Sequence, residues 1–389
     1  MKILMVLESS FPPDIRVSNE AASLIKAGHD VHIACYRKPG QAEKEELDGL
    51  IIHRFSIRKL RHKSSVGALK FPWYFNFWER HLNKLVAQEN FDTIHIHDLP
   101  LASVATKLRT NHNLKFVLDL HENWPALLNI STHTKTILGK ILCSIPQWEK
   151  YEKKYASLAD KVIVVVDEAK TRLITLGVDP DRISVVSNTL NMDLFNFPEQ
   201  IKNPDFVTLV YGGGINYHRG LQYAIEAIPL IKEKIPNIRL WVIGDGNYLQ
   251  TLKTLANNLN VNEYVKFWGW KKQQELLELL SQGDYAIIPH IRSAHTDATI
   301  PHKIFQYMYA GIPIISSDCL PLDRILKETG TGVCFKDQDA ENFAEVFLKL
   351  VENSTFLKQS AKKGKQWVVE KYNWEIDSGN LLKLYENLS

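Results

Sequence analysis

The chain has 389 residues and a net charge of +3, and apolar and charged residues make up 45% and 23% of it. At about 150 residues per domain, this length predicts two or three domains, and the proportions exclude a disordered, collagen-like or coiled-coil protein. No run approaches the roughly 18 consecutive apolar residues of a membrane span, and the N-terminal apolar run is too short for a secretory signal. The four cysteines lie too far apart for a metal-binding pair. We therefore expect a cytoplasmic protein with reduced thiols.

Residues 1–198 alternate short apolar runs with amphipathic stretches. The apolar runs predict strands at 3–7, 31–36, 51–55, 93–97, 116–120, 162–166 and 183–187. The amphipathic stretches predict helices at 16–27, 77–88, 102–109, 147–159 and 168–176. Because these strands are apolar on both faces and are separated by helices, they predict a parallel sheet that helices cover on both sides.

The same alternation continues after an interruption that contains Pro198 and Pro204. It predicts strands at 207–211, 239–243, 265–268, 285–289, 312–316 and 332–335. We therefore expect an α/β fold of two Rossmann-like, doubly wound parallel-sheet domains, 1–198 and 199–366, facing across a cleft. A helical tail, 367–389, is expected to return to the N-terminal domain. Open parallel sheets bind ligands beyond the carboxyl ends of their strands, so functional residues are expected there.

A basic and aromatic stretch precedes the second predicted helix. Six lysines and arginines and no acid lie between Asp48 and Glu79, and aromatic residues follow from Phe71 onward. One interpretation is contact of Arg54–Trp78 with an anionic membrane surface, where each basic side chain contributes about 1 kcal/mol. The other is a solvated basic loop followed by a helix whose aromatic side chains belong to the core. Nucleic acid is not expected as a partner, because the basic residues do not recur along one face.

Three glycines, Gly212, Gly213 and Gly214, follow the first strand of the second half, and Arg219 comes shortly after them. Glycine lets the backbone approach a ligand closely, and free amides next to a helix N-terminus favour an anion. Arg219 adds a fixed positive charge suited to phosphate. We therefore expect a phosphate-binding turn, and the alternative is a glycine-rich turn without a ligand. The spacing does not match the dinucleotide-binding fingerprint.

Thr299 opens a segment that predicts a helix and a following strand. Thr299 is a candidate cap, Pro301 suits the first turn, and Gly311 ends the helix. Lys303 adds its charge to the positive helix end, which predicts a second anion-binding group. Gln306 lies three residues on, on the same face, and is a candidate for bonding a sugar hydroxyl. The alternative is an amphipathic helix with one exposed lysine.

Two strands of the first half end in histidine and acidic residues. His97 and Asp98 close one strand, and His121 and Glu122 close the next. Strand ends lie near the expected cleft, where an imidazole could bond a sugar hydroxyl or relay a proton and the acids could orient it or bind acceptor hydroxyls. A structural role is the alternative. Arg16, after the first strand, either brings positive charge to the cleft or lies on the surface beside a helix cap.

These features together resemble a known family. The segment Pro-x-Lys-x-x-x-Tyr-Met-x-Ala-Gly-x-Pro, the glycine turn, Arg219-Gly220 and Gly244-Asp245-Gly246 are similar to motifs of the retaining glycosyltransferases of family four, which have the GT-B fold. The resemblance spans nearly the whole chain. It implies that the second domain binds a nucleotide-diphosphate sugar, that the first binds the acceptor, and that no metal cofactor is required.

The resemblance also implies roles for individual residues. Arg219 matches a basic residue that holds the diphosphate. Gln306 matches the second of two glutamates, which contacts the ribose. Ala298 stands at the place of the first glutamate, so Asp297 beside it is expected to contact the donor sugar instead. His121 matches a histidine that lies near the transferred sugar.

The resulting expectation is a retaining, hexosyltransferase-like enzyme that moves a sugar from a nucleotide-diphosphate sugar to a carbohydrate or lipid-linked acceptor, in surface polysaccharide or glycoconjugate biosynthesis. A cytoplasmic protein at the inner face of a membrane fits this expectation. Two alternatives stay open. One is a nucleotide-sugar epimerase on the same fold. The other is a non-catalytic nucleotide-sugar-binding partner of a polysaccharide assembly complex, because Ala298 and Gln306 replace both expected acids.

Overall fold

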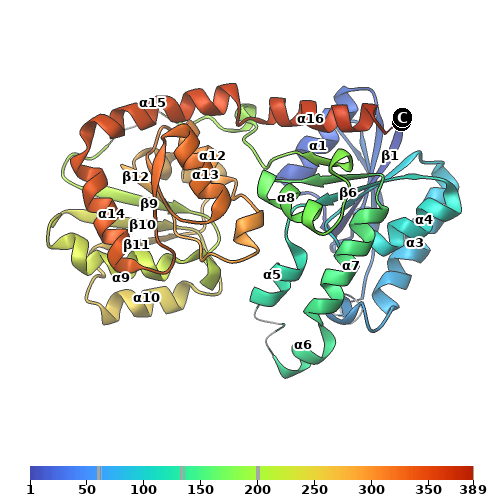
Figure 1. Cartoon of the computed structure of the whole chain (residues 1–389), viewed down its shortest axis with the longest axis horizontal. Coiled ribbons are helices and arrows are strands. Elements are labelled where there is room, and N and C mark those ends of the chain that lie inside the picture. Colours follow the sequence, from blue (N-terminus) through green and yellow to red (C-terminus); the bar gives the residue numbers. More distant parts are fainter. Residues whose placement is uncertain (59–61, 63, 132–133, 135, 199–201, 389) are drawn as a thin grey trace. The chain divides into compact units, whose positions relative to one another are not determined.

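The computed structural model describes residues 1–58, 62, 64–131, 134, 136–198 and 202–388 (Figure 1). It divides into two compact units, which we call the N-terminal unit (Met1–Ser187 with Glu375–Ser389) and the C-terminal unit (Asn188–Trp374). Figure 1 shows that the sheet of each unit is flanked by helices. The expected architecture of two parallel-sheet α/β domains is therefore confirmed.

The N-terminal unit contains an eight-stranded sheet with the order β3-β4-β2-β1-β5-β6-β7-β8. Its strands are β1 Lys2–Ser10, β2 Asp30–Tyr36, β3 Lys44–Leu47, β4 Leu50–Phe55, β5 Thr93–His97, β6 Lys115–Leu120, β7 Lys161–Val164 and β8 Ile183–Val185. All neighbouring pairs are parallel except β3 and β4. Its helices and short 3-10 turn are α1 Ile15–Lys26, η1 Ser64–Gly67, α3 Trp73–Glu89, α4 Ala102–His112, α5 Trp124–Ile130, α6 Ile137–Leu142, α7 Ile145–Leu158, α8 Asp167–Thr175 and α16 Trp374–Glu386.

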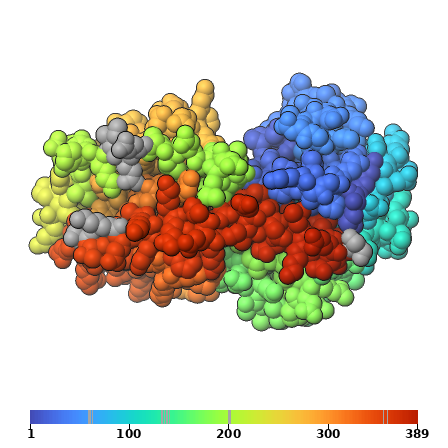
Figure 2. Space-filling view, turned by 90° about the horizontal axis from the view of Figure 1, so that it is seen from above, coloured from blue at the N-terminus to red at the C-terminus, as the bar shows by residue number. Residues whose placement is uncertain are grey.

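The C-terminal unit contains a six-stranded, fully parallel sheet with the order β11-β10-β9-β12-β13-β14. Its strands are β9 Val207–Gly212, β10 Ile238–Ile243, β11 Val265–Gly269, β12 Tyr285–Ile288, β13 Ile314–Ser317 and β14 Gly332–Phe335. Its main helices are α9 Leu221–Lys232, α10 Leu249–Asn258, α11 Gln273–Ser281, α12 Lys303–Tyr309, α13 Leu320–Thr329, α14 Ala340–Glu352 and α15 Ser354–Glu370. In Figure 2, α15 lies on the surface of this unit, in red.

The predicted strands all form, with ends shifted by a few residues, because runs apolar on both faces suit a sheet that is covered on both sides. Strand β3 was not predicted: three of its four residues are charged, all four are exposed, and it pairs antiparallel to β4 at the sheet edge. The helix predicted from Thr299 is shorter than expected. The Thr299 hydroxyl donates to the His295 carbonyl instead of capping, and α12 begins only at Lys303.

The chain passes between the units at Ser187–Asn188 and Trp374–Glu375, whereas the prolines predict a boundary at 198 and the helical tail one at 366. Residues after Asn188 lie with the C-terminal unit because they bond to it. Leu190 forms a parallel bridge with Asn373, and the Gln273 side chain donates to the Leu194 carbonyl at 2.7 Å. These contacts join residues far apart in the sequence, which a local pattern does not reveal.

The basic and aromatic stretch is partly core. Arg54 is buried, pairs with Glu45 at 2.6 Å and donates to the Phe11 carbonyl, so it cannot meet a membrane. The side chains of Tyr74, Phe77 and Trp78 are also buried. Lys59, Arg61 and Lys63 lie outside the described residues.

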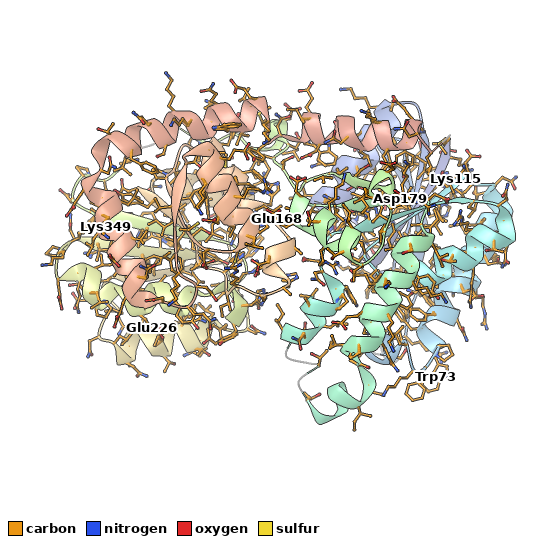
Figure 3. The ribbon with its side chains drawn as sticks, viewed as in Figure 1. Trp73, Lys115, Glu168, Asp179, Glu226 and Lys349 are labelled. Atoms are coloured by element: carbon orange, nitrogen blue, oxygen red, sulfur yellow. The ribbon has the colours of Figure 1, made fainter. Side chains whose placement is uncertain are left out.

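Two aromatic side chains of this stretch remain on the surface. Phe71 and Trp73 are 42% and 61% exposed and stack at a centroid distance of 5.3 Å, and Figure 3 shows Trp73 pointing away from the ribbon. Among the described residues, no helix is both long and apolar enough to cross a membrane.

Candidate functional site

The glycine turn after β9 is shaped by close contacts that only glycine allows. Gly213 has φ +138°, and a Cβ on it would lie 2.9 Å from the Lys303 Nζ. The Gly212 amide donates to the Tyr307 hydroxyl and the Gly213 amide to the Ile243 carbonyl, both at 2.9 Å. Two of the three amides expected to be free are therefore used by the fold. The Gly214 amide donates to no described group, so it is the one that can meet a ligand.

A second glycine turn supports the first from the neighbouring strand end. A Cβ on Gly244 would lie 1.9 Å from the Gly213 carbonyl oxygen, and one on Gly246 would lie 2.1 Å from the Ile215 carbonyl oxygen. The Ile215 amide also donates to the Asp245 carbonyl at 2.9 Å. The turns after β9 and β10 are thus packed backbone against backbone, which makes a stiff floor at this edge of the sheet.

Two cations lie at this floor without an acidic partner among the residues that the structure describes. Lys303 Nζ lies 3.7 Å from the centroid of the Tyr211 ring. Burial, together with the positive charge of Arg219, holds the pKa of Lys303 well below its usual range. Arg219 Nη1 donates to His290 Nε2 at 3.2 Å. Burial and the Arg219 charge likewise lower the pKa of His290 well below its usual range, so His290 is a neutral acceptor. Uncompensated positive charge in a partly buried place favours an anionic ligand.

Gln306 is oriented by a histidine that sequence reasoning did not single out. Its Nε2 donates to His302 Nδ1 at 3.0 Å, and His302 Nε2 donates to the Thr189 carbonyl at 3.1 Å. Burial lowers the pKa of His302 to about 4, so the ring is neutral and this tautomer is the one that satisfies both bonds. The Gln306 side-chain oxygen is left to accept from a ligand.

Asp297 is engaged elsewhere in the C-terminal unit. Its carboxylate accepts from Arg292 Nε at 3.0 Å and from the Leu320 amide at 2.8 Å, at the start of α13. Ala298 beside it is buried. Among the described residues, Asp297 forms its ion pair with Arg292 and not with Lys303 or Arg219, and a role in donor binding stays a prediction.

A buried chain of charges reaches the carboxyl end of β6 in the N-terminal unit. Arg16 Nη2 donates to both carboxylate oxygens of Asp119, at 3.0 and 3.2 Å. Asp119 Oδ2 lies 2.7 Å from Nε2 of His121, whose side chain is 17% exposed. Burial disfavours the charged form of His121, but the carboxylates of Asp119 and Asp98 outweigh it and raise its pKa to about 9. His121 is therefore an imidazolium at neutral pH, and it can donate hydrogen bonds but not accept a proton.

Other buried groups surround this chain. His97 Nδ1 lies 3.3 Å from Asp119 Oδ2 and 3.3 Å from His121 Nε2. Burial and the neighbouring His95 lower the pKa of His97 to about 3, so it is neutral. Burial, followed by the Asp119 charge, raises the pKa of Glu20 to about 8.

Glu20, His95, His97 and Asp119 offer ligand-type atoms within 4.8 Å of one another. Arg16 already supplies positive charge there, because its Nε lies 3.0 Å from Glu20 Oε1 while its Nη2 binds Asp119. The donor set therefore fits an ion-pair network better than a metal centre.

The candidate acceptor-side residues are only partly brought together. Arg16, His97 and His121 share the network around Asp119, and Asp98 Oδ2 lies 3.9 Å from His121 Nδ1. Burial raises the pKa of Asp98. Glu122 follows His121 and is half-buried.

Besides His302, sequence reasoning missed three residues that shape these sites. Glu20 lies four residues after Arg16 on α1, and that spacing was available as a sign of an ion pair. His290 follows a strand end, as His97 does, and the same argument applied to it. Nothing in the sequence indicated that the Tyr307 hydroxyl would bind the Gly212 amide, because that bond depends on how α12 packs on β9.

Comparisons with known proteins agree with this architecture. Residues 15–194 match the model described as Glycosyltransferase Family 4, and residues 193–367 match the one described as Glycosyl transferases group 1. An uncharacterized glycosyltransferase of Methanocaldococcus jannaschii is 23% identical over 99% of this chain and 98% of its own. The amylovoran biosynthesis glycosyltransferase AmsK of Erwinia amylovora is 22% identical over 62% of this chain and 60% of its own.

Solved structures give the same result. Sucrose-phosphate synthase from Thermosynechococcus elongatus has a TM-score of 0.80 at 18% identity, covering 100% of this chain and 98% of its own. HepE of Anabaena in complex with UDP has a TM-score of 0.74 at 13% identity, covering 100% of both chains. Two α/β units with these neighbours define the GT-B fold. Within that class the chain belongs to the group 1, or family four, glycosyltransferases.

Proposed function

We propose that this protein is a retaining glycosyltransferase that moves a sugar from a nucleotide-diphosphate sugar to an acceptor hydroxyl, in surface polysaccharide or glycoconjugate biosynthesis. The observation that carries the proposal is the pair Lys303 and Arg219, which lies at the glycine turn with no acidic partner in the described part of the chain. A diphosphate supplies the negative charge that this place lacks. The names of the relatives support the proposal: AmsK is named for amylovoran biosynthesis, and HepE was solved with UDP.

In the proposed reaction the bond from the anomeric carbon to the diphosphate breaks, and negative charge collects on the leaving phosphate oxygens. Lys303, Arg219 and the Gly214 amide stabilise that charge, so no metal is required. The acceptor oxygen attacks from the side that the diphosphate leaves, and its proton passes to a phosphate oxygen. Gln306 accepts from a ribose hydroxyl, and the His121 imidazolium donates to the transferred sugar.

Nucleotide affinity tests this proposal. Calorimetry with UDP, GDP and ADP identifies the nucleotide, and Lys303→Ala and Arg219→Ala should each weaken it at least tenfold, because a charge-assisted hydrogen bond contributes about 1.5–3 kcal/mol. Lys349→Ala is the matched control, because Lys349 lies on α14, 73% exposed and paired with Glu345. Unchanged affinity in both test variants refutes the assignment.

A non-catalytic nucleotide-sugar-binding protein is the second candidate. It is favoured by the absence of a glutamate at position 298 and by the engagement of Asp297 with Arg292 and Leu320. Tight binding of a sugar nucleotide, without transfer to any acceptor and without hydrolysis, would support it. Transfer that falls at least tenfold in Asp297→Asn would instead support a role for Asp297 in donor binding.

We also propose that the surface around Trp73 contacts a membrane that carries a lipid-linked acceptor. Phe71, Trp73 and Ile141 are large apolar side chains with 42%, 61% and 57% exposure, and Lys70 donates to the Ile141 carbonyl among them. Aromatic residues beside a lysine suit an anionic interface. Trp73→Ser should lower flotation with phosphatidylglycerol vesicles. Trp270→Ser is the control, because Trp270 is 70% exposed on the C-terminal unit. Equal flotation of both variants and the parent would contradict the proposal.

A further inference from the structure

A pocket of about 250 Å³ lies in the N-terminal unit, and its described lining includes neither Asp119 nor the histidines around it. Its walls come from the end of β1, from η1 and from helices α3, α5 and α7. The residues used below are Glu8, Tyr74, Trp124, Trp148, Ser65 and Ser131. Because β1 pairs in parallel with β5, and β5 with β6, Glu8 lies at the same edge of the sheet as His97 and His121.

One wall of the pocket is aromatic and apolar. The rings of Trp124 and Trp148 meet at a centroid distance of 6.1 Å and an interplanar angle of 61°. Leu128 on α5 extends the same wall. Aromatic faces carry negative charge density, and the C–H groups of a pyranose ring carry a small positive one. Such a wall therefore fits the apolar face of a sugar ring.

The other end of the pocket is polar. The Tyr74 hydroxyl donates to Glu8 Oε1, and the Tyr36 hydroxyl bonds to that of Tyr74. Burial raises the pKa of Glu8 to about 8, so the carboxyl is protonated at neutral pH. A protonated carboxyl both donates and accepts hydrogen bonds, as the hydroxyls of Ser65 and Ser131 do.

The charge of the pocket selects among ligands. No lysine or arginine is among its described lining residues, and His62 is the one described lining side chain that can become positively charged, so a phosphate or carboxylate would have at most that one counter-charge. Groups that both donate and accept match sugar hydroxyls. The volume is below the roughly 300–1,000 Å³ of sites for drug-sized ligands, so it suits one ring rather than a chain of rings.

We propose that this pocket binds one uncharged pyranose ring of the acceptor, with the ring face against Trp124 and Trp148 and its hydroxyls bonded to Glu8. This inference rests on the proposed glycosyl transfer, because it identifies the ring as part of the acceptor. It excludes an acceptor that presents an anionic sugar at this position.

Saturation-transfer NMR on the full chain tests the inference with methyl α- and β-glycosides of glucose, galactose, mannose and N-acetylglucosamine as probes. At least one glycoside should receive saturation, and Trp124→Leu should weaken its binding about tenfold or more. Trp270→Leu is the matched control, since Trp270 lies on the C-terminal unit, outside the pocket, and is 70% exposed. It should change the affinity less than twofold.

The pH dependence provides a second readout that a folding defect does not imitate. Binding to the parent protein should weaken at least threefold between pH 7 and pH 9.5, because Glu8 loses the proton it donates. Glu8→Gln keeps a neutral donor and acceptor, so its binding should stay within threefold of the parent at pH 7 and should not change with pH.

Two results overturn the inference: no saturation of any probe, or saturation that Trp124→Leu leaves unchanged. Nucleotide affinity, measured on the same variants, separates this outcome from failure of the proposed function. If Trp124→Leu loses the glycoside but keeps the nucleotide, the pocket is a sugar site. If the parent binds a glycoside but no nucleotide, the pocket stands and the proposed glycosyl transfer fails.

Discussion

The imidazolium state of His121 is the most sharply testable feature of the N-terminal unit. We predict that Asp119→Asn converts His121 to a neutral ring at pH 7. The raised pKa of about 9, against 6.5 for an unperturbed histidine, depends on the Asp119 carboxylate at 2.7 Å and on Asp98 at 3.9 Å. With Asp119 neutral, burial and the positive charge of Arg16 both act to lower the pKa.

The magnitude follows from the size of the pKa shift. About 2.5 units correspond to roughly 3 kcal/mol of interaction between the His121 cation and its surroundings. Burial and the Arg16 charge remain in the variant, and only the more distant Asp98 carboxylate still raises the pKa, so the midpoint should fall from about 9 to below 7. In the parent, this interaction stabilises the folded state fully below pH 6.5 and is lost as the pH rises through 9.

Two-dimensional NMR of the imidazole carbon and proton measures the midpoint directly, and His121→Gln assigns the signal. Asp98→Asn is the matched control, because it removes the more distant carboxylate and should lower the midpoint by a smaller amount. Asp119→Asn also leaves Arg16 without its bidentate partner. Because breaking a buried ion pair costs about 3–5 kcal/mol, circular dichroism must show that the Asp119→Asn protein is folded. A midpoint near 9 in Asp119→Asn, or a larger shift in Asp98→Asn, refutes the reasoning.

Three further predictions concern the glycine turn, Lys303 and Glu8. Gly213→Ala should weaken nucleotide binding at least tenfold, because residue 213 has φ +138° and a Cβ there would lie 2.9 Å from Lys303 Nζ. Gly214→Ala, whose Cβ would have its nearest contact at 3.7 Å, should lower the affinity much less. Equal losses of affinity in calorimetry would contradict this prediction. The pKa of Lys303 is depressed in the free protein, and a bound diphosphate should raise it, so nucleotide binding should take up protons and weaken as the pH rises. Calorimetry in buffers of different ionisation enthalpy measures the proton uptake, and Lys303→Arg should abolish this uptake. Between pH 4.5 and 8 the folded state holds a proton on Glu8 that the unfolded state releases, so the free energy of unfolding should fall across this window. At pH 9, Glu8→Gln should therefore be more stable than the parent, by at most about 1.4 kcal/mol per unit of pKa shift. Denaturant unfolding that shows no gain in stability would contradict the raised pKa.

Local patterns were enough to identify the elements and the places where chemistry collects. A short run of apolar residues is enough to recognise a strand that is buried on both faces. The residue after such a strand lies at the carboxyl edge of the parallel sheet, whatever the position of the strand in the sheet. The glycine turn, Lys303, His97 and His121 were all found in this way. The exceptions were elements without an apolar pattern, such as β3, which is mostly charged and exposed.

Partners far apart in the sequence were decided by the packing of the units. The Gly213 position next to Lys303 and the bond from the Leu320 amide to Asp297 each require a particular packing of helices and loops on the strands. The sequence resemblance indicated which positions to examine, but it did not show which donors and acceptors were already used.

By itself, then, the sequence determined the two parallel sheets, their order along the chain and the residue types at their carboxyl edges, because each of these depends on neighbours a few residues away. Only the tertiary structure decided which charges are paired. Arg16 is neutralised by Asp119, whereas Arg219 and Lys303 have no acid among the described residues. The physical reason is that Coulomb interactions depend on distance and burial, and both are set by contacts between segments that lie far apart along the chain.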